Sequence, residues 1–258
     1  MAKPGPAVQL VLLWHVHQPD YAPVPDEGPL LPWTRLHALR NYGDLIDVLG
    51  RHPSVRSTLD VDAVLLERFA SYEDGTARPD PFLRAARRDP ADLSFEERRF
   101  VLTAFLDVPR TMLARNLPRV HELAARRGQY GANVVPDSVV ARFGVDDLRD
   151  LQMLFHLAWC GSVLRGDERV GAWIERGRSF SEQDKHDLLD LQAVYLSGMA
   201  GRLRELASAG HVELSVGPQF HPVMPLLCDV ESAHETDPNL RLPARGFAYP
   251  EDVRTQLE

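Results

Sequence analysis

The chain has 258 residues, of which 44% are hydrophobic and 26% charged, and its formal net charge is −8 at pH 7. This composition is typical of a globular protein, with a length that suits one large domain or part of a larger one. The acidic balance argues against a nucleic-acid partner, because nucleic-acid surfaces concentrate lysine and arginine. Two cysteines, Cys160 and Cys228, lie in apolar stretches and favour buried reduced thiols over a disulfide framework.

The first predicted element is a strand that ends in the segment Leu10-Val-Leu-Leu-Trp-His-Val-His-Gln-Pro19. Its apolar run is too short to span a membrane, so the chain is expected to be cytoplasmic. A continuous apolar run without alternation is typical of a strand buried on both faces of a parallel sheet. Ligands bind at the carboxyl ends of such strands, which makes His15 and His17 candidate site residues. Residues two apart on an extended backbone point the same way, so both imidazoles are expected to face one pocket.

The next elements predicted are a helix over residues 36–49, ended by Gly50, and a second strand over residues 55–61. Asp60 lies near the carboxyl end of that strand, and a helix is expected over residues 62–73. Strand, helix and strand in this order indicate a parallel α/β sheet.

Residues 94–209 carry little strand signal and are predicted to form a helical insertion between the second and third strands. Two segments in it, Ser94-Phe-Glu-Glu97 and Ser181-Glu-Gln-Asp184, have the pattern that begins a helix. The third strand follows over residues 211–217, with Val212, Leu214 and Val216 on one face and Glu213 and Ser215 on the other. It ends at the turn Pro218-Gln-Phe-His-Pro222, which carries His221.

Polar groups therefore occur at three predicted strand ends: His15 and His17, Asp60, and His221 with Glu213 upstream. A lone histidine or aspartate is often structural, whereas three such ends at one sheet edge indicate a site. Aromatic residues lie beside these ends and either pack in the core or offer flat faces to sugar rings: Trp14, Tyr21, Trp33 and Phe220.

Other chemistries find less support. His-x-His with a carboxylate is compatible with a zinc site that keeps an open position, but no His-Glu-x-x-His or cysteine cluster occurs. We therefore expect no metal and no other cofactor. Gly-x-Ser-x-Gly and phosphate-binding glycine loops are also missing from the sequence.

The segments Leu12-Leu-Trp-His-Val-His-Gln-Pro19, Gly210-His-Val-Glu-Leu-Ser215 and Phe220-His-Pro-Val-Met-Pro-Leu-Leu-Cys-Asp229 resemble the first two signature regions of glycoside hydrolase family 57. Further segments that are similar to its amylopullulanase-like branch are Leu31-Pro-Trp-Thr-Arg-Leu-His-Ala-Leu39, Asp147-Leu-Arg-Asp-Leu-Gln152 and Phe247-Ala-Tyr-Pro-Glu-Asp252. The resemblance covers essentially the whole chain.

The resemblance implies the N-terminal portion of an incomplete (β/α)7 barrel in a retaining enzyme that hydrolyses α-glucans or transfers them as a 4-α-glucanotransferase. The expected parts are a first unit over 8–75, the helical insertion over 94–209, and the third strand with its following loop over 210–258. The resemblance also implies a substrate wall formed by His15, His17, Gln18, Trp33, Glu213 and His221.

The family's nucleophile and acid/base belong to its third and fourth regions, which this chain does not contain. No catalytic residue is therefore assigned, and the residues around Asp60 depart from the family pattern. A barrel cut after its third strand leaves an open edge, so the chain alone is expected to be unstable or inactive.

Two alternatives remain open. The first is a metal-dependent deacetylase or mannosidase on a related barrel, with zinc on His15 and His17. The second is a non-catalytic carbohydrate-binding remnant that keeps the sugar wall without the carboxylates. Both the glycoside hydrolase interpretation and the carbohydrate-binding remnant predict an α-glucan or oligosaccharide as the partner.

Overall fold

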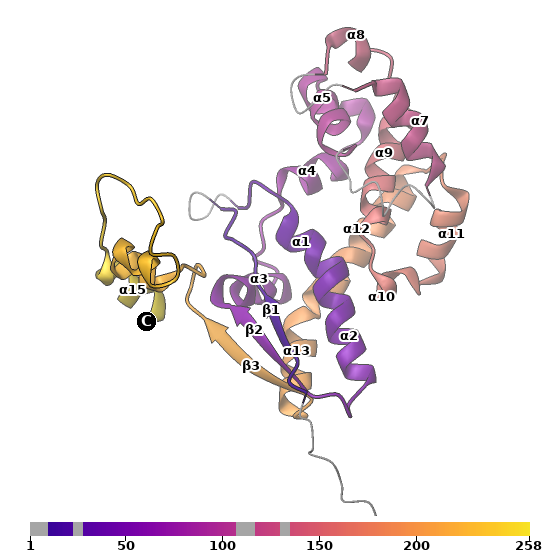
Figure 1. Ribbon diagram of the computed structural model, residues 1–258. Helices are drawn as coiled ribbons and strands as arrows, with labels where there is room; N and C mark the ends of the chain where they lie inside the picture. The colour runs from indigo at the N-terminus through magenta and orange to yellow at the C-terminus, as the bar shows by residue number, and fades with distance from the viewer. Residues whose placement is uncertain (1–9, 23–27, 107–116, 130–134) are drawn as a thin grey trace, which may run out of the picture.

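The computed structural model describes residues 10–22, 28–106, 117–129 and 135–258 (Figure 1). Three strands form one open sheet in the order β1-β2-β3, and both pairings are parallel. The strands are β1 (Leu13–Val16), β2 (Ser57–Asp62) and β3 (Val212–Gly217). The predicted parallel α/β class is confirmed, whereas no barrel closes within the described residues.

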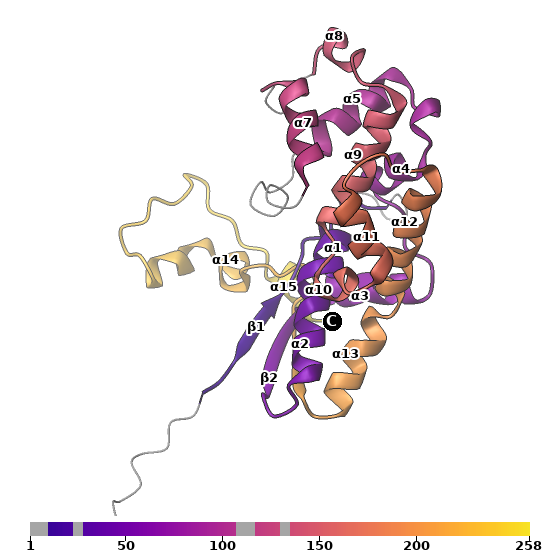
Figure 2. The same cartoon turned by 90° about the vertical axis from the view of Figure 1, so that its right-hand side faces the viewer.

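The two faces of the sheet differ in polarity. Alternation along β2 buries Leu59 and Val61 on one face, where helices α2 (Gly43–Arg51), α3 (Ala63–Glu73) and α13 (Met199–Ser208) lie (Figure 2). The other face carries mostly polar or exposed side chains: Leu13, His15, Thr58, Asp60, Glu213 and Ser215. Only one face therefore belongs to the hydrophobic core.

Between β1 and β3 the described chain also forms other helices. They are α1 (Trp33–His37), the π-helical turn η1 (Ala38–Tyr42), α4 (Pro81–Arg87), η2 (Pro90–Asp92), α5 (Phe95–Ala104), α7 (Pro118–Arg127), α8 (Asp137–Val140), α9 (Val145–Ala158), α10 (Ser162–Arg165), α11 (Glu168–Arg176) and α12 (Glu182–Ser197). Helices α4 to α12 build a body that extends beyond the sheet (Figures 1 and 2). Parts of the predicted first unit and of the predicted insertion lie outside the described residues.

Helix α9 is the centre of this helical body, because nearly all its residues from Leu148 onward are buried. The ring of Phe155 stacks on Phe105 with centroids 4.5 Å apart and on Phe82 at 5.6 Å. The amide of Gln152, also on α9, donates to the Ala85 carbonyl oxygen at 2.7 Å. Oε1 of Gln152 accepts from Nζ of Lys185 at 2.9 Å, so both ends of this buried amide are paired.

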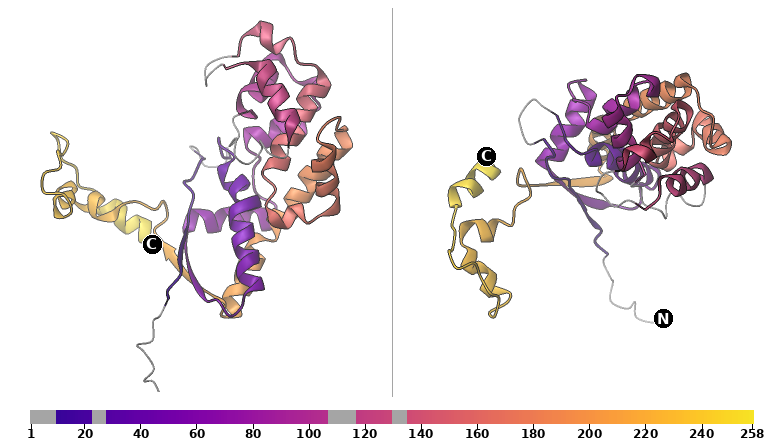
Figure 3. Two further views of the ribbon diagram at one scale, coloured as in Figure 1. Left: turned by 45° about the vertical axis from the view of Figure 1, so that its right-hand side comes forward. Right: turned by 90° about the horizontal axis from the view of Figure 1, so that it is seen from above.

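The chain after β3 lies on the other side of the sheet from the helical body (Figure 3). It contains α14 (Met224–Cys228), the 3-10 turn η3 (Val230–Glu235) and α15 (Pro250–Leu257). The backbone N–H groups of Gln219 and Phe220 donate to the carbonyl and side-chain oxygens of Gln256, at 3.1 and 2.8 Å. Helix α15 thereby braces the turn that carries His221.

Three predictions from the sequence are wrong. The run that leads into β1 is not buried on both faces: Leu10 is 82% and Trp14 44% exposed, and β1 pairs only with β2 among the described residues. Gly50 does not end its helix, since α2 continues to Arg51 and His52 is the C-cap. Cys228 is exposed at the end of α14, and only Cys160 is a buried thiol.

Candidate functional site

The candidate site lies at the carboxyl edge of the sheet, where β1 and β2 bring His15 and Asp60 side by side. The two residues are register partners, and Nδ1 of His15 lies 2.9 Å from Oδ2 of Asp60. A carboxylate only accepts hydrogen bonds, so Nδ1 carries a proton and donates a hydrogen bond to Asp60. This bond fixes the ring orientation, and in the neutral ring it leaves Nε2 of His15 as an acceptor on the exposed face.

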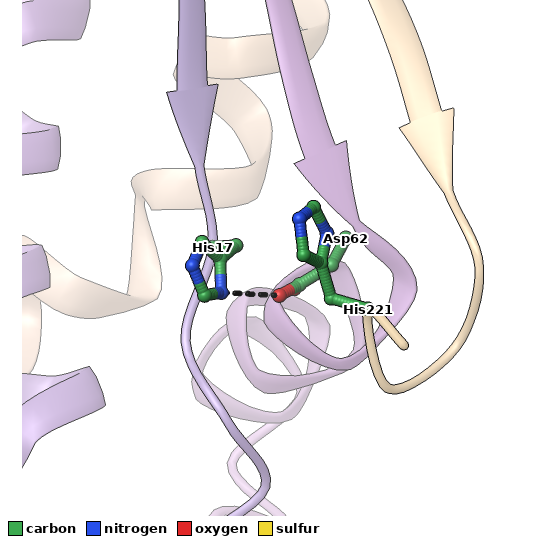
Figure 4. Close-up of side chains that lie close together, drawn as sticks. All are labelled: His17, Asp62 and His221. Carbon is green, nitrogen blue, oxygen red and sulfur yellow. Dashed lines mark ion pairs between the residues drawn. The ribbon is translucent and has the colours of Figure 1, made fainter. Parts of the chain in front are cut away.

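Two residues after His15 and Asp60, His17 lies close to Asp62. Asp62 is both the last residue of β2 and the N-cap of α3, and its Oδ1 accepts the Leu65 backbone N–H at 2.7 Å. Its Oδ2 accepts the Gln18 N–H at 3.1 Å and lies 3.7 Å from Nδ1 of His17 (Figure 4). Asp62 thus joins the start of a helix to the residue that follows His17.

His221 completes the group from the turn after β3. Its ring stacks on that of His17, with centroids 4.5 Å apart and planes only 5° from parallel. The backbone of His221 has φ of 52°, a left-handed conformation that non-glycine residues adopt seldom. This conformation turns the imidazole back toward Asp62, so three strand ends meet at one place (Figure 4).

Gln18 supports this arrangement from behind. Its side chain donates from Nε2 to the Tyr42 hydroxyl at 2.8 Å and accepts from the Tyr21 hydroxyl at 2.9 Å. The Tyr42 hydroxyl in turn donates to the carbonyl oxygen of His17 at 3.0 Å. Gln18 therefore holds the chain that carries His17 in place.

Burial shapes the electrostatics of the same group. Loss of solvation raises the pKa of the Asp62 carboxyl, an effect that the N–H donors of Leu65 and Gln18 oppose. Loss of solvation also raises the pKa of the Tyr42 hydroxyl, which stays protonated and able to donate near neutral pH.

Two of the predicted substrate-binding residues lie away from this group. Trp33 is half-buried at the start of α1, and its ring packs against Phe82 and Trp159 with centroids 6.5 and 6.1 Å away. Glu213 is near the amino end of β3 and lines a hollow there, together with Arg56 and Leu10. The structure brings together His15, His17, Gln18 and His221, and leaves Trp33 and Glu213 elsewhere.

Asp62 is the residue that the sequence analysis missed. It was placed inside the predicted helix over 62–73 and given no role in the site. The segment Asp60-Val-Asp62 repeats the polar–apolar–polar pattern of His15-Val-His17, and the two segments lie on neighbouring parallel strands. That repeated pattern was the signal that could have found it.

These features define a class of protein before any comparison is made: a parallel α/β protein with a polar site outside the carboxyl ends of its strands. The chain matches the family model for Glycosyl hydrolase family 57 over residues 11–258. The protein therefore belongs to glycoside hydrolase family 57, as its signature segments indicated. Membership implies activity on α-glucans, by hydrolysis or by transglycosylation.

Comparison with curated proteins and with solved structures gave no match. No helix in the described ranges is long and apolar enough to cross a membrane.

Proposed function

We propose that this chain is the N-terminal segment of a retaining α-glucan hydrolase or 4-α-glucanotransferase and forms one wall of its substrate site. The observation that carries the proposal is the row of imidazoles at the carboxyl edge: His15 held by Asp60, and His17 stacked on His221. All three rings are exposed on a surface that meets solvent. Sugar hydroxyls both donate and accept hydrogen bonds, so a set of fixed imidazoles suits them.

His15 has the clearest role under this proposal. Because Nδ1 donates to Asp60, Nε2 is an acceptor of known direction for one sugar hydroxyl. His17 and His221 would contact the same sugar or the next one. Gln18 acts by holding the backbone of this segment, since its own amide is already bonded to two tyrosines.

The two family carboxylates that break the glycosidic bond are assigned to no residue of this chain. Retaining hydrolysis needs a nucleophile and an acid/base with carboxyl groups about 5–5.5 Å apart. The carboxylates at this edge, Asp60 and Asp62, are already bonded to His15 and to the Leu65 and Gln18 amides. We therefore place catalysis on residues that the matched signature segments do not include.

Calorimetric titration of the purified chain with maltoheptaose tests the wall. Loss of one hydrogen bond to a sugar costs about 1 kcal/mol, so His15→Ala should weaken binding about fivefold. His52→Ala is the matched control, because His52 is exposed at the far end of α2 and should leave the affinity unchanged. Equal affinities for the wild type and His15→Ala would contradict the proposal.

A reducing-end assay on the same samples tests the placement of catalysis. We expect the chain to bind maltoheptaose without releasing sugar. Release of reducing ends by the purified chain would show that its own carboxylates perform the reaction.

A further inference from the structure

The group formed by His17, Asp62 and His221 has the composition of a metal site. Each residue offers one ligand atom, and these atoms all lie within 4.8 Å of one another. They come from the ends of β1 and β2 and from the turn after β3, so the parallel sheet itself brings them together (Figure 4). We infer that this group binds one divalent transition-metal ion of the zinc class.

The carboxylate of the group is positioned in advance. The side chain of Asp62 is only 1% exposed, and backbone N–H groups of Leu65 and Gln18 hold its two oxygens. A carboxylate oxygen can accept more than one partner, so Oδ2 keeps capacity for an ion on the side that faces His17. Bonded oxygens of this kind are typical of metal ligands whose orientation the protein fixes.

The ligand set selects the class of ion. Two imidazole nitrogens and one carboxylate oxygen suit Zn²⁺ and Co²⁺, whereas Ca²⁺ and Mg²⁺ prefer all-oxygen sites. The side chain of His17 is 45% exposed and His221 is exposed as well, so a further position on the ion would be open to solvent. Three protein ligands with one open position are the arrangement of zinc sites that exchange a bound water.

The stacked rings must change when the ion binds. A metal lies close to the plane of the imidazole that binds it, and two parallel rings cannot both direct a lone pair at one ion. One ring therefore has to turn about its terminal torsion, which has broad energy wells in histidine. His221 is the ring expected to turn, because it lies on an exposed turn while His17 is held through Gln18 and Tyr42.

His15 is not part of this site, which separates the inference from a metal on the His15-Val-His17 pair. Nδ1 of His15 donates a hydrogen bond to Asp60, and this pair precedes His17 and Asp62 along the two neighbouring strands. The inference shares His17 and His221 with the proposed sugar wall but does not depend on glucan binding.

Titration of the metal-free chain with Co²⁺, followed by its visible absorption, tests the inference directly. We expect one equivalent to bind, with the absorption of four-coordinate Co²⁺, and Zn²⁺ to displace it. His17→Ala and His221→Ala should each weaken Co²⁺ binding about 100-fold or more, because each removes one of three protein ligands. Asp62→Asn, which keeps the helix cap, should weaken it as well.

His15→Ala is the matched control for the metal, and its Co²⁺ affinity should stay within about twofold of the wild type while its maltoheptaose affinity falls. Thermal unfolding of each variant verifies that it folds, and His221→Ala is the safest because His221 is exposed. Absence of stoichiometric Co²⁺ binding, or a loss in His15→Ala equal to that in His17→Ala, would overturn the metal site. An unchanged maltoheptaose affinity in His15→Ala would instead contradict the sugar wall and leave the metal site standing.

Discussion

The three histidines at the sheet edge are held in different ways, and this difference assigns their roles. His15 has a fixed proton on Nδ1 because Asp60 accepts it. His17 is held through Gln18 and Tyr42, whereas His221 lies on an exposed turn and stacks on the ring of His17. A fixed acceptor suits a sugar hydroxyl, whereas a held ring beside one that can turn suits an incoming ion.

A fourth histidine, His156, acts on stability. It is fully buried on α9, where loss of solvation lowers its pKa to about 3, and its Nδ1 lies 3.0 Å from Oε1 of Gln192. The folded protein therefore keeps this ring neutral at pH values where the unfolded chain, with a pKa near 6.5, takes up a proton. Its contribution to stability is complete above about pH 6.5 and falls as the pH drops toward 3.

The titration of His156 should lower the free energy of unfolding by up to about 1.4 kcal/mol for each unit that the pH drops between about pH 6 and 4. His156→Gln removes the titrating group, so its unfolding free energy should vary less steeply with pH. Urea unfolding of both proteins at several pH values measures the two slopes. Equal slopes would show that His156 does not titrate differently in the folded and unfolded chains.

At the scale of elements, local sequence signals decided where several helices begin. Both predicted helix starts are confirmed, and each is a capping box: Ser94 caps α5 with Glu97, and Ser181 caps α12 with Asp184. These signals are reliable because the side chain and backbone that pair lie only three residues apart. The prediction that the helix ends at Gly50 is wrong because the end of α2 also depends on tertiary contacts, and a glycine within a helix costs only about 1 kcal/mol.

The capping box at Ser181 also joins two helices. The Asp184 carboxylate accepts from the Ser181 N–H at 2.8 Å and from the indole N–H of Trp173, on α11, at 2.8 Å. Ser181→Ala should lower the free energy of unfolding by about 1 kcal/mol, because it removes the acceptor for the Asp184 N–H.

Chemical denaturation of Ser181→Ala beside Ser208→Ala measures this effect. Ser208 is exposed at the end of α13, and its substitution should change stability by less than about 0.5 kcal/mol. Equal values for the two variants would mean that the capping box contributes nothing measurable.

At the scale of the whole molecule, the order of elements predicted the parallel sheet, and the sheet predicted where its polar groups meet. His15 and His17 were identifiable because an apolar run stops at them, and His221 because a strand stops before it. Trp33 and Glu213 were predicted from their places in the sequence and from the family resemblance, and neither meets the histidines. Trp33 packs against Trp159 in the helical body, and Glu213 lies at the amino end of β3. Such long-range placement cannot be read from local pattern.

The open sheet also bears on the expected instability of the chain. Strands β1 and β3 each pair only with β2 among the described residues, and apolar residues near these edges are exposed, including Val11 and Val216. Exposed strand edges favour association with other strands. The site draws its histidines from β1 and from the turn after β3, so it includes residues of both edge strands' carboxyl ends.

The central claim is that the carboxyl edge of this sheet is one wall of an α-glucan site. A crystal structure of the protein with a bound malto-oligosaccharide tests it most directly. We predict a sugar hydroxyl within hydrogen-bond distance of Nε2 of His15, with His17 or His221 in contact with the same sugar or the next one. An ordered oligosaccharide bound elsewhere, such as in the hollow beside Glu213 at the amino end of the strands, would contradict it.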